Sequence, residues 1–324
     1  MRPCRALRGK VRGCMRRLAI GVASLALVVL LVGLAFLVEA HREIRSLDPA
    51  LPEPAALSRA VAVPNAPVAL WQVLTASQTG QGGAALSHPA FVLEWSDGRL
   101  FLIDTGMDRE GAREFGGVFE LLLGSAPIET FGPPGELLAA AAERVAGVAF
   151  THLHLDHTGG LASLCVSRSR ELPVFQTPWQ AELGNYTTAP GREDLEAASC
   201  ARFERLRGGP VFAIPGFPGL VAVQAGGHTP GSSIFAAKVR DRIWIFSGDI
   251  TNERSALLEN RPKSALYSLL VTPEAPGPLA KLRRWLGGLD AAPGFSVVVS
   301  HDGGALQASG IPAWSTRGVP TGMR

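Results

Sequence analysis

The chain has 324 residues, of which 47% are hydrophobic and 18% charged, enough for one large folded domain or two small ones. Its net charge of +3 depends on seven Lys and Arg within residues 1–17; the rest of the chain has 24 basic against 28 acidic residues, a net charge of −4. Nucleic acid is therefore not expected as a partner, because proteins that bind phosphate backbones gather basic residues around the binding surface.

Residues 18–38 are an apolar run without a charged side chain. As a helix this run is about 30 Å long, the thickness of the hydrocarbon core of a bilayer. The basic tail 1–17 precedes it and only Arg42 and Arg45 follow closely, so the positive-inside rule predicts a cytoplasmic N-terminus and an extracytoplasmic domain, in the periplasm or at the cell surface. We expect an uncleaved single-pass anchor. A cleaved signal peptide is the alternative, although its apolar core usually has only about 7–15 residues.

Residues 39–67 contain five prolines, which predict a semi-rigid linker without helix or strand. The folded domain is then expected over residues 68–324. Phe91–Trp95 and Arg99–Ile103 predict a β-hairpin around Asp97-Gly98. Further strands are expected at 145–150, 173–176, 220–223, 234–239, 242–246 and 295–299, and helices near 136–144, 192–206 and 279–286. This alternation predicts an α/β (α+β) layered domain.

Three histidines and an aspartate lie within six residues, at His152, His154, Asp156 and His157. In an extended segment, alternate side chains share one face, so the first three are expected to converge on one point while His157 reaches a neighbouring point. Two adjacent cations fit this pattern better than one. Packing explains the cluster poorly, because metal ligation is the common use of these groups at such spacing.

Further ionisable residues come just after predicted strands. His228 follows residues 220–223 through a Gly-Gly pair, Asp249 follows 242–246 through Ser-Gly, and His301 follows 295–299 directly. Asp104 closes the strand 99–103 in the same way. Taken singly, each could be a surface residue or a turn cap. Taken together, they predict a site at the rim of a packed sheet.

The ordered motifs His152-x-His154-x-Asp156-His157, Gly-His228-Thr-Pro-Gly-Ser, Gly-Asp249 and His301 resemble the signature of the metallo-β-lactamase superfamily, across residues 91–301. The resemblance implies an αββα sandwich with the site at one edge of two facing sheets. It also implies that His152, His154 and His228 bind a first metal, that Asp156, His157 and His301 bind a second, and that Asp249 bridges the two. Asp104 matches the family's early aspartate, which orients a ligand histidine.

Five imidazoles and two carboxylates suit two Zn²⁺ ions, with Mn²⁺, Fe²⁺ or Co²⁺ as alternatives. Two such ions activate water for attack on an acyl or phosphoryl centre, with Asp249 and Asp156 as the catalytic carboxylates. The ligand set most resembles that of lactonases and ester hydrolases, and the scarcity of basic residues beside the motifs favours a small neutral ester, lactone or amide as the substrate. Their tyrosine shortly after the bridging aspartate is absent here, where Asn252 lies three residues beyond Asp249. A phosphodiesterase, a β-lactamase-like hydrolase and a non-catalytic metal-binding protein are the alternative interpretations.

Several other residues have less certain roles in the sequence. Residues 106–135 carry Phe115 and Phe119, which predict an amphipathic helix with core-facing rings or, alternatively, an apolar entrance to the site. Cys165 and Cys200 could form a disulfide across a loop of about 35 residues in an oxidising compartment, which the spacing alone leaves open. The sequence assigns no role to His41 or His88.

Overall fold

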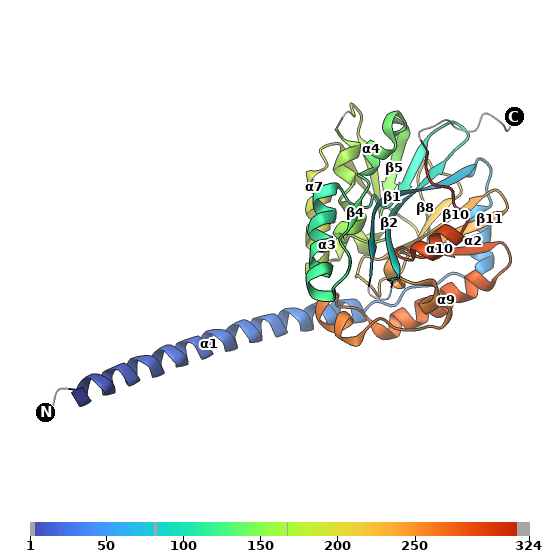
Figure 1. Ribbon diagram of the computed structural model, residues 1–324. Coiled ribbons are helices and arrows are strands. Elements are labelled where there is room, and N and C mark those ends of the chain that lie inside the picture. The colour runs from blue at the N-terminus through green and yellow to red at the C-terminus, as the bar shows by residue number, and fades with distance from the viewer. Residues whose placement is uncertain (1–3, 81–82, 167, 316–324) are drawn as a thin grey trace.

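The computed structural model describes residues 4–80, 83–166 and 168–315. A long helix, α1 (Cys4–Arg45), projects away from a layered domain that contains the rest of the described chain (Figure 1). Its residues Met15–Arg45 are long and apolar enough to cross a membrane, by length and composition. The expected anchor 18–38 lies within this helix, and its side chains are almost all exposed.

The domain is built on two β-sheets that pack face to face. The larger sheet has the order β4-β1-β2-β3-β5-β6-β7 and the smaller one β12-β11-β10-β9-β8. The strands are β1 (Ala69–Thr79), β2 (Ala85–Glu94), β3 (Leu100–Ile103), β4 (Glu129–Thr130), β5 (Val145–Ala149), β6 (Leu172–Gln176), β7 (Ala201–Arg205), β8 (Val211–Ala213), β9 (Leu220–Gln224), β10 (Ser233–Val239), β11 (Arg242–Phe246) and β12 (Phe295–Val298). An apolar core between the sheets includes Phe91 and Phe101 from one sheet and Phe235 and Phe246 from the other.

Helices cover the outer faces of both sheets, which completes an αββα sandwich and confirms the expected fold (Figure 1). The helices and helical turns after α1 are α2 (Pro54–Val61), α3 (Arg109–Leu123), α4 (Pro134–Leu137), η2 (Ala139–Arg144), α5 (Leu155–Thr158), η3 (Leu161–Leu164), α6 (Pro178–Glu182), η4 (Tyr186–Thr188), α7 (Ala189–Ala197), η5 (Gly248–Ile250), α8 (Arg254–Leu258), the π-helix η6 (Tyr267–Val271), α9 (Pro276–Ala291) and α10 (Gly303–Ala308). Leu161 and Leu195 pack on the larger sheet, whereas Leu282 and Leu286 of α9 pack on the smaller one.

Residues 39–67 differ from the predicted linker. They contain the end of α1 and all of α2, whose Leu57 and Val61 are fully buried in the core beneath the smaller sheet. Trp285 of α9 donates its indole N–H to the carbonyl of Pro52 at 2.9 Å. Proline at the first turn of α2 starts the helix rather than preventing it, because that position needs no N–H donor. The segment is therefore packed against the domain. The division of the chain at residues 17, 38 and 67 stays a prediction.

The predicted helix 192–206 is wrong in its second half. Helix α7 ends at Ala197, and residues 201–205 form β7, which pairs in parallel with β6. A disulfide joins Cys165 to Cys200, the residue before this strand, with the two Cα atoms 5.3 Å apart. Pairing with the sheet edge overrides the helical tendency of the acidic sequence before it. The predicted β-hairpin is confirmed, with β2 and β3 paired antiparallel around Asp97-Gly98.

Candidate metal centre

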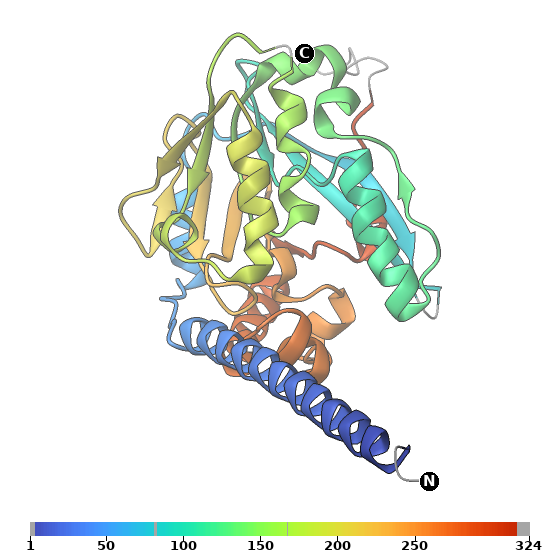
Figure 2. The same cartoon turned by 90° about the vertical axis from the view of Figure 1, so that its left-hand side faces the viewer.

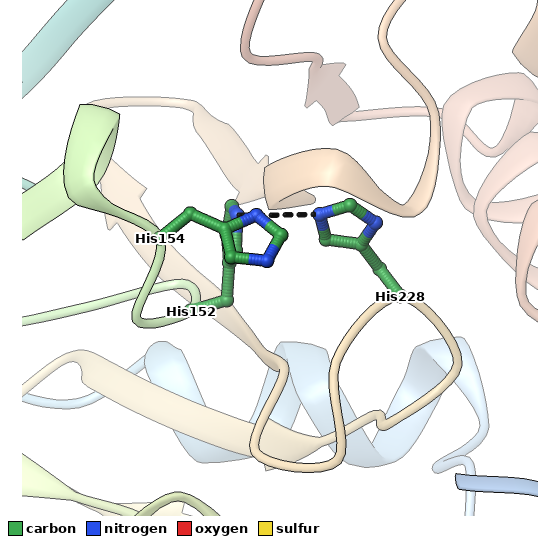
Figure 3. A group of neighbouring side chains, drawn as sticks. All are labelled: His152, His154 and His228. Carbon is green, nitrogen blue, oxygen red and sulfur yellow. Dashed lines mark hydrogen bonds between the residues drawn. The ribbon is translucent and has the colours of Figure 1, made fainter. Parts of the chain in front are cut away.

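Three histidines from two loops turn their rings toward one another at one edge of the paired sheets (Figure 3). His152 and His154 lie between β5 and α5, and His228 lies in the loop between β9 and β10. His154 Nδ1 is 3.0 Å from His152 Nε2 and 3.2 Å from His228 Nε2. Three nitrogens at these distances can share one ion, the set that the motif resemblance implies for the first metal.

A second group lies beside the first and contains two histidines and two aspartates. Asp156 Oδ2 is 3.6 Å from His157 Nε2 and 3.4 Å from His301 Nε2. Asp249 Oδ1 is 3.4 Å and 3.1 Å from the same two nitrogens. The other carboxylate oxygen of Asp249, Oδ2, lies 3.7 Å from His228 Nε2 of the first group. Asp249 therefore faces both groups, and all seven predicted residues come together.

The local backbone brings these residues together differently from the extended geometry expected for 152–157. His154 is the N-cap of α5, and Asp156 and His157 lie within that single helical turn. The turn directs Asp156 to the second group. Its carboxylate stays within 4.8 Å of a ring nitrogen of His152, but no group able to hold a cation among the described residues contains both Asp156 and His154, which alternation along a strand had grouped. Gly248, just before Asp249, has φ +54°, and a Cβ there would lie 2.7 Å from Thr151 Cβ. Glycine thus lets the Asp249 loop approach the His152 loop closely.

The ring nitrogens that face away from the centre have oxygen partners. Asp104 Oδ2 is 2.9 Å from His157 Nδ1, and the same carboxylate accepts hydrogen bonds from the backbone and hydroxyl of Thr151. The carbonyl oxygen of Ser87 is 2.9 Å from His301 Nδ1, and the hydroxyl of Thr187 is 2.8 Å from His154 Nε2. Such outer partners fix the ring orientation and leave the opposite nitrogen directed inward.

Burial keeps the first group uncharged. It is the main cause that lowers the pKa of His154 to about 3, and it also lowers the pKa values of His152 and His228. A neutral imidazole is the form that binds a metal. At His157, burial lowers the pKa, but the carboxylates of Asp104 and Asp156 outweigh it and raise the pKa well above its usual value. A cation that binds the second group would therefore displace protons.

The buried polar atoms at the centre fit a bound cation. His157 Nε2 and Asp249 Oδ1 face each other, and neither makes a hydrogen bond to any of the described residues. Buried polar atoms without a partner are costly, and a metal ion would supply the missing interaction for both. The donors are imidazole nitrogens and carboxylate oxygens, which suit Zn²⁺, Mn²⁺, Fe²⁺ or Co²⁺.

Two groups at the site were missed by sequence reasoning. His88 in β2 is buried with Nδ1 3.4 Å from Asp156 Oδ2, and neither of its ring nitrogens makes a hydrogen bond to the described residues. Together with Asp156 and His301 it forms a further group able to hold a cation. His88 lies inside a strand rather than after one, so a search for ionisable residues that follow predicted strands does not find it. A lone histidine in a strand is also common without any such role.

The second missed group is a buried ion pair behind His228. Glu274 Oε1 is 2.6 Å from His228 Nδ1, and Lys263 Nζ is 2.9 Å from the same oxygen and from the carbonyl of Asp249. Burial raises the pKa of Glu274, but the hydrogen bond to His228 and the charge of Lys263 outweigh it, and the pKa falls to about 2. Lys263 and Glu274 lie in loops that carry no motif, so the sequence did not reveal them.

A cavity of about 420 Å³ leads to the metal-binding groups. Phe115 and Phe119 of α3 line it together with Leu86, Leu155 and Val271, while His154, Asp156, Asp249 and His301 reach its inner end. Helix α3 is therefore the helix expected within residues 106–135, and its two phenylalanines also form the apolar entrance to the site. Asn252 and Tyr267 also line the cavity, whereas the hydroxyl of Tyr186 donates to the carbonyl of Val271.

Comparison with known proteins agrees with this fold. A family model described as the metallo-beta-lactamase superfamily matches residues 83–169. The search of curated proteins found no match. The solved structure of an N-acyl homoserine lactone hydrolase with N-hexanoyl-L-homoserine at its catalytic metal centre is 13% identical, with a TM-score of 0.55 over 75% of this chain and 96% of that one.

Two further solved structures have the same fold. A mutant of the B. thuringiensis protein AiiA, with N-decanoyl-L-homoserine bound at its active site, is 13% identical, with a TM-score of 0.55 and the same coverage, 75% and 96%. A probable metal-dependent hydrolase from Staphylococcus aureus is 12% identical, with a TM-score of 0.50 over 73% of this chain and 90% of that one. Residues 83–169 thus match the metallo-β-lactamase superfamily, and the domain has the αββα sandwich fold of these solved structures.

Proposed function

We propose that the domain is a hydrolase that holds two metal ions, most simply Zn²⁺, and cleaves neutral esters or lactones. The observation that carries the proposal is the pair of adjacent histidine and carboxylate groups, which share Asp249 and lie at the inner end of an apolar cavity. His152, His154 and His228 would hold one ion, and Asp156, His157 and His301 the other, with Asp249 between them. When bound, two such ions supply Lewis acidity and activate water at neutral pH.

The residues of this chain have separate tasks in the proposed reaction. Asp249 would hold the two groups together, because its Oδ1 faces His157, its Oδ2 faces His228 and both oxygens lie 3.1 Å from His301 Nε2. Asp156 lines the cavity beside His88 and His301 and is the carboxylate placed to pass a proton to the leaving group. The phenol of Tyr267 faces the same cavity, and burial raises its pKa, so the hydroxyl stays protonated and able to donate a hydrogen bond.

The walls of the cavity favour a neutral substrate. Apart from the aspartates at its inner end, Glu114 is the one charged residue among the described residues that line it, and none of these is Lys or Arg. A phosphodiester would need basic groups near its phosphate. Arg261 and Lys263 line a neighbouring cavity, but Arg261 is paired with Glu253 and Glu259, and Lys263 with Glu274. Two solved structures that share the fold hold N-acyl homoserines, the ring-opened products of neutral lactones, which supports this choice.

The rates of hydrolysis of two nitrophenyl compounds and a lactone test the proposal. The full-length, zinc-loaded protein in detergent should hydrolyse nitrophenyl butanoate and an acyl-homoserine lactone with higher kcat/KM than bis-nitrophenyl phosphate. Activity should disappear on chelation and return with zinc. Asp249→Ala should remove it, whereas Asp241→Ala, an exposed aspartate between β10 and β11, should not. A higher kcat/KM for the phosphodiester would identify a phosphodiesterase, and bound metal without hydrolysis would identify a non-catalytic metal-binding protein.

A further inference from the structure

The cavity above the metal-binding groups continues into a second one. The neighbouring cavity, about 530 Å³ in volume, shares Phe119, Asn252, Tyr267 and Val271 with the first as lining residues. The two therefore form one two-lobed cleft, with the metal-binding groups in one lobe and Leu266 at the edge of the other. Each lobe has a volume typical of a small-molecule site.

The outer edge of this cleft is apolar and exposed. We define the rim as Leu266, Leu269 and Val271, in and just before the π-helix η6, whose exposed fractions are 65%, 50% and 55%. Three large apolar side chains exposed within six residues are unusual at the surface of a domain whose other apolar residues are mostly buried. Val271 belongs to both the rim and the cleft wall, so the apolar surface runs from the outside of the domain to its interior.

The apolar helix α1 is attached to this same rim. His41 Nε2 lies 3.1 Å from the carbonyl oxygen of Leu269. Phe36 packs on the ring of Tyr186 with centroids 5.1 Å apart, and the Tyr186 hydroxyl donates to the carbonyl of Val271 at 3.3 Å. Figures 1 and 2 agree that α1 leaves the domain on the side where the segment around η6 lies.

If α1 spans a bilayer, these contacts determine where the rim lies relative to the membrane surface. Phe36 is two residues from the end of the apolar run 18–38, a distance of about 3 Å along the helix. Because that run has the length of a hydrocarbon core, Phe36 lies near its outer boundary. Tyr186, in contact with Phe36, and Val271, bonded to Tyr186, must then lie at the membrane surface. The exposed leucines of the rim would face lipid.

We propose that the cleft opens onto the bilayer and admits amphiphilic esters or lactones from the membrane, with their acyl chain along the apolar walls and their carbonyl group toward the metal-binding groups. This rests on the proposed hydrolase function and on α1 as a membrane anchor. The acyl chain of the substrate would contact the side chains of Phe115, Phe119, Leu86 and Val271 in the cavity wall. A longer acyl chain concentrates the ester in the bilayer and contacts more of these walls, so kcat/KM should rise with the length of the acyl chain.

A spin label tests the position of the rim without any measurement of activity. Leu269→Cys is prepared in a chain with Cys4→Ser and Cys14→Ser; the remaining cysteines, Cys165 and Cys200, are paired. The labelled full-length protein is reconstituted into phosphatidylcholine vesicles. The nitroxide should be more accessible to oxygen, which concentrates in lipid, than to a water-soluble nickel chelate. Ser96→Cys is the control, because the turn between β2 and β3 lies at the strand ends away from His88 and Asp104. Its label should show the opposite accessibility, and a label at 269 that behaves like the one at 96 would refute the proposal.

The length of the substrate's acyl chain is varied in the same vesicles to test the substrate class. The kcat/KM for nitrophenyl dodecanoate should exceed that for the butanoate by more than about tenfold. Leu269→Asp should lower this ratio about fivefold, because a charge at the rim disfavours contact with lipid. Ser96→Asp should leave the ratio unchanged. An equal kcat/KM for both esters, or an unchanged ratio in Leu269→Asp, would refute membrane access while leaving the hydrolase intact. If neither ester is hydrolysed, the proposed function itself fails, and the spin label still reports on the rim.

Discussion

The buried pair of Glu274 and Lys263 behind His228 makes a quantitative prediction for stability. In the metal-free protein, Glu274→Gln removes the charge that His228 and Lys263 stabilise while it keeps the shape of the side chain. The pKa of Glu274 is lowered from 4.5 to about 2. At about 1.4 kcal/mol per unit, this difference corresponds to about 3 kcal/mol of folding free energy. Because the pKa in the folded state is the lower one, the stabilisation is complete above pH 4.5 and is lost as the pH falls toward 2.

The assay is urea unfolding of the full-length protein in detergent after removal of metal, followed by tryptophan fluorescence. Glu274→Gln should lower the free energy of unfolding by about 3 kcal/mol at pH 7, with the same difference at pH 6 and a smaller one below pH 4.5. Glu171→Gln, which removes an exposed partner of Arg202, should have no measurable effect. A loss below about 1 kcal/mol, or a difference that persists unchanged to pH 3, would refute the reasoning.

Three further predictions concern separate parts of the molecule. His88→Ala should weaken binding of the second metal ion about tenfold or more in a chelator competition, since the ring adjoins Asp156 and His301; unchanged affinity would exclude His88 as a ligand. Titration of the denatured, unreduced full-length protein should find two reactive thiols, those of Cys4 and Cys14, and removal of the disulfide between Cys165 and Cys200 should destabilise the domain by about 2–4 kcal/mol; four free thiols would exclude the disulfide. An alkaline phosphatase fused to the C-terminus should be active, because the basic tail keeps the N-terminus cytoplasmic; an inactive phosphatase with an active cytoplasmic reporter at the same position would contradict this topology.

The sequence predicted a layered α/β domain, and the motif resemblance implied the sandwich and the seven residues that the structure brings together, because each signal was local. Strands such as β10 and β11 are short apolar runs bounded by turn residues, and His228, Asp249 and His301 lie in the short loops just after β9, β11 and β12. A buried strand that ends in an ionisable side chain has few explanations other than a site at the sheet edge. The same logic could not find His88, which lies in the middle of β2, or Glu274, which follows no strand.

The errors in the sequence analysis arose where distant contacts decide local structure. Residues 201–205 carry two arginines and a glutamate that suit a helix, yet parallel pairing with β6 makes them a strand. Prolines around α2 suggested a spacer, but Leu57 and Val61 have a core to enter beneath the smaller sheet. A fragment that begins at residue 68, where the sequence predicted the start of the folded domain, would therefore lack Leu57 and Val61 and with them part of the core.

Metal content tests the central claim most directly. The full-length protein, grown with excess zinc and never exposed to a chelator, should contain close to two metal ions per chain by elemental analysis. Asp249→Ala should lower this number, because one carboxylate serves both groups, while Asp241→Ala should not change it. One ion or fewer per unmodified chain would contradict the two-metal hydrolase proposed here.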